Sequence, residues 1–127
     1  MCCVKLRNTL IGYSSIFTHL IFNFFYMEIN KNSGEQITLV QAQQMVNEFR
    51  QRFPEAIKGY FAGSNHFDKI LQQEDCVGLR IYNGYDKDTD STNLVIVGVN
   101  SNNEDMTKEY ILDKAIPCPP YCGISEL

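Results

Sequence analysis

The sequence predicts an α+β fold, in which two N-terminal helices pack on a small antiparallel sheet of about three strands and a C-terminal tail rich in Pro and Cys follows. Apolar residues recur at helical spacing in the first half of the chain and at a spacing of two in the second. Helical patterns followed by consecutive short strands are typical of a meander with helices on one face. A chain of 127 residues, 44% of them hydrophobic, is long enough for one such core.

The composition of the chain changes at Met27. Residues 1–26 hold only two of the eleven basic residues, Lys5 and Arg7, and none of the fifteen acidic ones. Three interpretations of this apolar extension stay open: a membrane anchor or uncleaved signal sequence over residues 8–26, an extra element packed on the domain, or a spurious extension before a true start at Met27. Residues 27–127 are predicted to form a single α+β domain, cytoplasmic unless the extension anchors it.

The first helix is predicted over residues 38–53. Thr38 is the expected N-cap, and Gln41 at the third helical position completes a capping box. Pro54 is expected to end the helix, because its ring clashes with the preceding turn. One face carries an apolar stripe of Ala42, Met45, Val46, Phe49 and Phe53. We expect this stripe to pack on the sheet, with Phe49 in the interface.

Whether residues 54–63 form a short helical turn stays open, and a second helix is expected over residues 64–75. Ser64 or Asn65 would cap this second helix. Its predicted core-facing residues are Phe67, Ile70 and Leu71.

Three strands are predicted over residues 76–84, 93–100 and 108–116. The first alternates apolar and other residues, and the second is denser in β-branched residues, as expected for a strand covered on both faces. A polar hairpin loop over residues 85–92 joins them. Three residues of these strands, Leu79, Val95 and Val97, are expected to be buried.

Three stretches carry a resemblance to a known family: "GSNHFDKILQQEDCVGLRIY", "LVIVGV" and the terminal "IPCPPYCG". Over about residues 36–124 the chain resembles small proteins of Bacteroidota-type bacteria that share the PCPPYCG motif. Members of that family begin near Met27, which agrees with the change in composition. The resemblance implies a bacterial domain but no particular activity.

Cys118 and Cys122 bracket Pro119 and Pro120 in the tail. Their spacing matches neither the C-x-x-C of redox motifs nor that of zinc knuckles, and an extended path would hold their Cα atoms too far apart for a disulfide unless the chain folds back. Structural thiols, a disulfide or redox pair, and a metal site stay open. We expect the tail to dock on the domain. The candidate thiol site is Cys118, Cys122 and Cys76, and the candidate zinc ligands are these three residues with His66.

Three aspartates alternate in the hairpin loop. Asp86, Asp88 and Asp90 resemble the start of a calcium loop, but Ser91 stands where such a loop needs Gly and Val97 where it needs Glu. An acidic turn is the favoured interpretation, because Asp, Ser and Thr are ordinary turn residues.

The sequence favours a small non-enzymatic interaction or accessory module, with a protein partner or a second copy of the chain. It contains no Gly-rich phosphate loop and no nucleophile-elbow or zinc-protease motif. A net charge of −4 argues against nucleic acid as a partner. Residues 27–127 are expected to make no membrane contact, and no cofactor is expected. The alternative is a thiol-based redox or metal-binding protein that uses the C-terminal cysteines.

Overall fold

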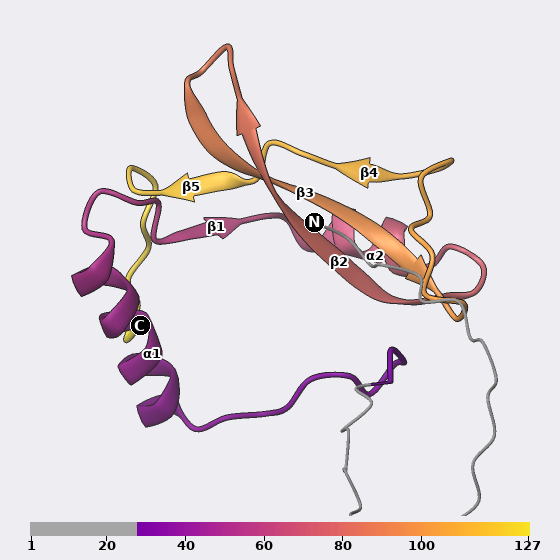
Figure 1. Ribbon diagram of the computed structural model, residues 1–127, viewed down its shortest axis with the longest axis horizontal. Coiled ribbons are helices and arrows are strands. Elements are labelled where there is room, and N and C mark those ends of the chain that lie inside the picture. The colour runs from indigo at the N-terminus through magenta and orange to yellow at the C-terminus, as the bar shows by residue number, and fades with distance from the viewer. Residues whose placement is uncertain (1–27) are drawn as a thin grey trace, which may run out of the picture.

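The computed structural model describes residues 28–127, so the predicted apolar extension lies outside the described residues. Two helices and five strands follow one another along the chain (Figure 1). Their bounds are α1 (Leu39–Arg52), β1 (Gly59–Phe61), α2 (Ser64–Leu71), β2 (Cys76–Asp86), β3 (Ser91–Asn100), β4 (Ile111–Leu112) and β5 (Ile116–Cys118). This mixture of helices and antiparallel strands confirms the α+β class. In residues 28–127, no helix is long and apolar enough to cross a membrane.

The prediction of one sheet with about three strands is wrong in detail. The five strands form two antiparallel sheets, one of β2, β3 and β4 in that order and one of β1 and β5. The expected strand over residues 108–116 is divided near Lys114, whose φ of 58° turns the backbone out of the extended region. The chain therefore pairs with β3 only over β4, and the following strand, β5, pairs with β1.

Residues 59–61 form strand β1, in a stretch where the sequence left a short helical turn open. Tyr60 lies opposite Pro117 and Phe61 opposite Ile116. The backbone N–H of Lys58 extends the pairing, because it donates to the carbonyl of Cys118 at 2.7 Å. A strand therefore separates the two helices, and only α1 precedes the sheets.

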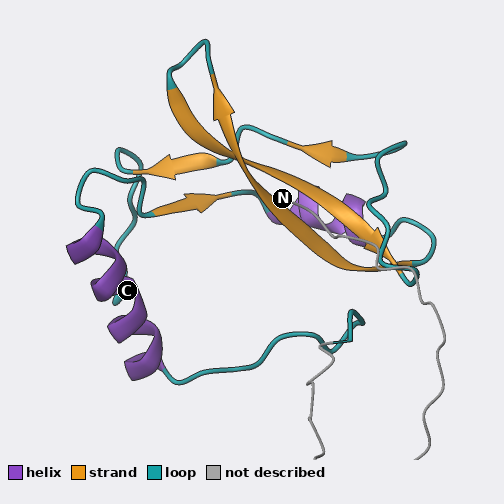
Figure 2. Cartoon of the chain, in the orientation of Figure 1, coloured by secondary structure: helices purple, strands orange, loops and turns teal. Residues whose placement is uncertain are grey.

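The hairpin of β2 and β3 is the largest element of the fold, and Figure 2 shows it as a twisted ribbon across the molecule. Its register runs from Cys76 opposite Asn100 to Asp86 opposite Ser91, with a bulge between Cys76 and Gly78. The bulge interrupts the alternation that the sequence predicts for β2, because one extra residue enters that strand.

The core lies between α2 and one face of the three-stranded sheet, where α2 lies behind the hairpin in Figure 1. Gly98 of β3 makes this approach close, because a Cβ built there would lie 3.1 Å from both the Cys76 sulfur and Ile70 Cγ2. The buried cluster consists of Ile70, Cys76, Ile96 and Leu112.

Two details of the second helix differ from the prediction. Its N-cap is Gly63 and not Ser64 or Asn65, and no side chain caps it. Leu71 is 46% exposed, because the helix ends there and only Ile70 reaches full burial. Phe67 packs against the core as expected.

Of the three strand residues expected to be buried, Val97 is buried, with 3% of its surface exposed. Val95 and Leu79 are half-buried. Val97 pairs with Arg80 on β2 and with Ile111 on β4.

The expected packing of α1 on the sheet is wrong. The capping box of Thr38 and Gln41 forms as predicted, but no residue of α1 is buried and Phe49 is 41% exposed. The helix stands apart from the β2–β3 hairpin, and the C-terminal segment runs beside it (Figure 1). The short connection from α1 leads directly into β1, so the pairing of β1 with β5 holds the helix beside the tail.

Candidate functional site

Cys118 and Cys122 form a disulfide at the end of β5. Their Cα atoms are 4.8 Å apart, and the Tyr121 N–H donates to the Pro117 carbonyl at 3.2 Å. The peptide bonds before Pro119 and Pro120 are both cis. The short Cα distance and this hydrogen bond show that the segment does not follow the extended path expected from its prolines. The chain folds back between the two cysteines, as the sequence analysis required for a disulfide.

A cavity of 470 Å³ adjoins this disulfide. Two of the residues around it, Arg50 of α1 and Lys58 before β1, are cationic, and no acidic residue is among its described lining residues. Their full set is Val46, Arg50, Lys58, Gly59, Cys118, Cys122, Gly123, Ser125 and Leu127. Ligand pockets in proteins are typically about 300–1,000 Å³, so the cavity can hold a small molecule.

Arg50 links α1 to the tail beside this cavity. Its terminal nitrogen donates to the main-chain oxygen of Leu127 at 2.9 Å, and Gln43 donates to the Glu126 carbonyl at 3.0 Å. The Nε atom of Arg50 is buried and has no hydrogen-bond partner among residues 28–127. Burying a guanidinium nitrogen without a partner costs free energy.

The other predicted zinc ligands lie elsewhere. Cys76 is buried in the core, and its thiol donates to the Gly78 carbonyl at 3.3 Å. His66 lies at the start of α2, with Nδ1 2.6 Å from the Tyr110 hydroxyl. In the described part of the chain, no group of three or more His, Cys, Asp or Glu side chains could hold a metal ion. The three cysteines among residues 28–127 therefore divide into one buried thiol and one disulfide.

Two of the three aspartates in the hairpin loop, Asp86 and Asp90, accept hydrogen bonds from within their own turn, as the favoured acidic-turn interpretation predicts. The Asp86 carboxylate accepts the backbone N–H of Asp88 at 2.8 Å and that of Thr89 at 3.4 Å, and Asp90 accepts the Tyr85 hydroxyl. These bonds are those of an acidic hairpin turn. The hydrogen bond from the Asp88 backbone, followed by that from the Thr89 side chain, lowers the pKa of Asp86.

This lowered pKa predicts a pH-dependent effect of Asp86→Asn. The stabilisation by ionised Asp86 is present above the ordinary pKa of 3.8 and is lost as pH falls through the lowered folded-state value. We expect Asp86→Asn to lower the free energy of unfolding at neutral pH and to have a smaller effect well below pH 3.8. Urea unfolding at both pH values measures this difference, with Asp88→Asn as the control. An equal loss at both pH values would contradict the prediction.

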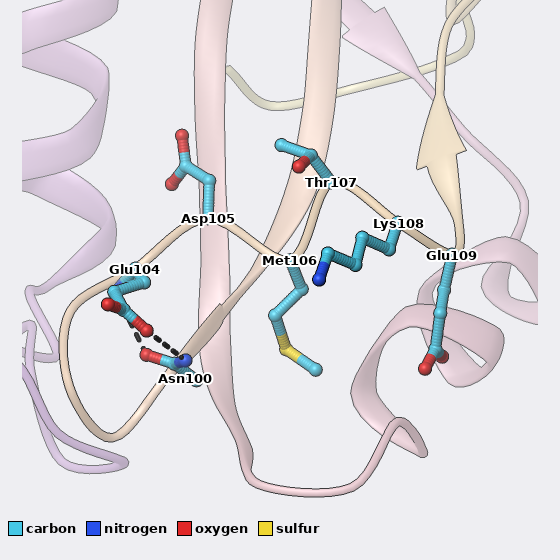
Figure 3. A pocket seen from close by; sticks show the side chains of 7 residues that line it. All are labelled: Asn100, Glu104, Asp105, Met106, Thr107, Lys108 and Glu109. Atoms are coloured by element: carbon cyan, nitrogen blue, oxygen red, sulfur yellow. Dashed lines mark hydrogen bonds between the residues drawn. The ribbon is translucent and has the colours of Figure 1, made fainter.

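A second cavity, of 270 Å³, lies at the loop between β3 and β4 (Figure 3). Asn100 donates to the Glu104 carboxylate at 3.0 Å and accepts the Glu104 backbone N–H at 2.9 Å. The Asp105 side chain points away from these two in Figure 3, and Met106 points inward. The Asn100 and Glu104 groups thus satisfy each other, which indicates a loop-stabilising role.

Sequence analysis did not find the polar network that Asp105 makes on β2. Its carboxylate accepts from Arg80 at 2.5 Å and from the Tyr82 hydroxyl, while Arg80 also donates to Asn103. The bond to Asp105, followed by burial, raises the pKa of Tyr82. Arg80 and Tyr82 lie two residues apart and therefore share one face of the predicted strand. No local sequence pattern indicates that the loop after β3 brings Asp105 to that face. The network holds the loop after β3 against β2.

The apolar stripe of α1 is a third candidate site. Met45, Phe49 and Phe53 are 63%, 41% and 54% exposed. The rings of Phe49 and Phe53 pack on each other with centroids 5.1 Å apart, which gives one continuous apolar surface. Helical spacing predicts this stripe, but not that it faces solvent.

No family model matches the chain, and neither a curated protein nor a solved structure is significantly similar to it. The resemblance to the family with the PCPPYCG motif therefore stays a prediction. The inferences that follow depend on the geometry of α1 and of the disulfide.

Proposed function

We propose that the protein is a non-enzymatic interaction module that binds a protein partner through the apolar stripe of α1. The observation that carries this proposal is the exposed surface of Met45, Phe49 and Phe53. Amphipathic helices normally bury such a stripe, because packing supplies most of the stability of a helix in a protein. Exposed apolar patches of this kind typically mark interaction sites.

The neighbouring face of α1 supports this role. Gln43 and Arg50 hold that face against the tail, so the helix is tethered with the stripe outward. The stripe also lies at the spacing with which a helix inserts anchors into an apolar groove, one residue for each turn. Phe49 and Phe53 are the expected anchors, because aromatic residues dominate binding energy at interfaces.

The test is to replace Phe49 by Asp and to compare it with Gln44→Asp, which adds the same charge to the polar face of the same helix. We expect Phe49→Asp to weaken binding of the partner by about thirtyfold or more, the loss typical of a hot-spot residue. The free energy of unfolding should change by less than about 1 kcal/mol, because Phe49 is exposed and α1 makes few contacts with the sheets.

Pull-down with the full chain and sedimentation over a range of concentrations provide the readouts. Capture of another protein, or self-association, that is lost in Phe49→Asp and kept in Gln44→Asp would support the proposal. Equal binding by all three proteins would contradict it. Binding to lipid vesicles that depends on Phe49 would show a membrane surface and not a protein as the partner.

A further inference from the structure

We propose that the Cys118–Cys122 disulfide is a thiol–disulfide exchange site whose substrate is a small thiol bearing a carboxylate. Three features converge there: an accessible disulfide, a cavity that adjoins it, and two cations around that cavity. This inference is independent of the role proposed for the α1 stripe, because Met45, Phe49 and Phe53 do not line the cavity and only Val46 of the stripe does.

An external thiol can reach the disulfide from the cavity. Thiol–disulfide exchange requires that an external thiolate reach a sulfur atom. Cys122 is exposed and Cys118 is half-buried, and both line the cavity. Cys122 is therefore the expected point of attack. Cys118 is the expected leaving group, since β5 holds it by pairing with Gly59 and by the bond from Lys58 to its carbonyl.

The third feature is charge. A thiolate forms on Cys118 when the disulfide opens, and neighbouring cations stabilise a thiolate. Lys58 supplies this positive charge together with Arg50, whose guanidinium also donates to the main-chain oxygen of Leu127. A thiolate that also carries a carboxylate is attracted to these cations more strongly than a thiolate with no further charge, and an added ammonium group weakens the attraction.

The reaction balances with two equivalents of the thiol. The first thiolate attacks Sγ of Cys122, the protein S–S bond breaks, and Cys118 leaves as a thiolate that takes up a proton. A second thiolate attacks the sulfur of the bound thiol and releases Cys122 as its thiolate. Two external thiols are thereby oxidised to one disulfide, and the protein disulfide is reduced to two thiols.

The experiment measures the rate at which 3-mercaptopropionate, 2-mercaptoethanol and cysteamine reduce the air-oxidised full chain. Alkylation and mass spectrometry of the peptide that holds Cys118 and Cys122 exclude signal from Cys76 and the other cysteines. Each rate is divided by the rate for the double variant Arg50→Gln, Lys58→Gln, so that the intrinsic reactivity of each thiol cancels. We expect this ratio to be about fivefold higher for 3-mercaptopropionate than for 2-mercaptoethanol, and lowest for cysteamine.

Arg52→Gln is the matched control, because Arg52 lies on the same helix, is exposed, and pairs with Glu48 away from the cavity. Its rates should equal those of the unmodified protein. If the double variant unfolds, ionic strength provides the second test. Added salt should slow 3-mercaptopropionate more than 2-mercaptoethanol, because the first attacks with two negative charges and the second with one. Equal ratios for all three thiols, no effect of salt, or free Cys118 and Cys122 in the air-oxidised protein would overturn the proposal.

Discussion

Replacing Ile70 by Ala should lower the free energy of unfolding by about 2–5 kcal/mol, the range for truncating a buried aliphatic side chain. Ile70 is 0% exposed and is the largest fully buried side chain among residues 28–127. It joins α2 to the sheet, because its Cγ2 methyl lies against Gly98 of β3. Few other side chains share this role, so the truncation leaves a cavity that the small core fills poorly.

The neighbouring residue provides the control for this prediction. Leu71 belongs to the same helix, has the same number of side-chain carbons, and is 46% exposed. Leu71→Ala should cost clearly less than Ile70→Ala, about 1 kcal/mol or less. Chemical unfolding followed by circular dichroism measures both. Similar losses for the two variants would mean that α2 is rotated relative to the arrangement described.

Local signals were sufficient to predict some elements from the sequence. The capping box of Thr38 and Gln41 begins α1, and Pro54 follows soon after the helix ends. The polar turn between two apolar runs predicts the β2–β3 hairpin, because strand alternation and turn residues act over short distances. Phe67 and Ile70 likewise reach the core as their spacing predicts.

Non-local pairing explains the elements that the sequence did not predict. Residues 59–61 form a strand only because β5 returns beside them from more than fifty residues later in the chain. The divided sheet and the exposed stripe of α1 follow from this pairing. It draws the end of the chain away from β3 and α1 away from the hairpin, and no local propensity encodes either outcome.

The candidate sites show the same division. Spacing identified Cys118 and Cys122 and left the choice between thiols, disulfide and metal open, since that choice depends on how the tail folds back. The cavity beside them could not be predicted, because Arg50 and Lys58 come from before β1 and the cysteines from the chain end. In the same way, the sequence placed Cys76 at the start of a strand, but its burial depends on α2 and β3.

Gly98→Ala should lower the free energy of unfolding by about 1–3 kcal/mol, although alanine is normally the better residue in a strand. The added Cβ would lie 3.1 Å from the Cys76 sulfur and from Ile70 Cγ2, and 3.3 Å from the Met106 sulfur. These neighbours belong to different elements, so a shift that lengthens one short contact leaves the other short contacts in place. The substitution therefore forces α2 away from β3.

Gly78→Ala is the matched control, because Gly78 also lies in the hairpin but a Cβ there meets no atom within 4 Å. We expect this control to be neutral or slightly stabilising. Adding Cys76→Ala to Gly98→Ala removes the sulfur at one of the short contacts. The double variant should therefore be more stable than the sum of the two single effects by about 0.5 kcal/mol or more. Strictly additive effects would show that the Cys76 sulfur does not prevent a side chain at position 98. The close approach of α2 to β3 would then not be the reason for glycine there.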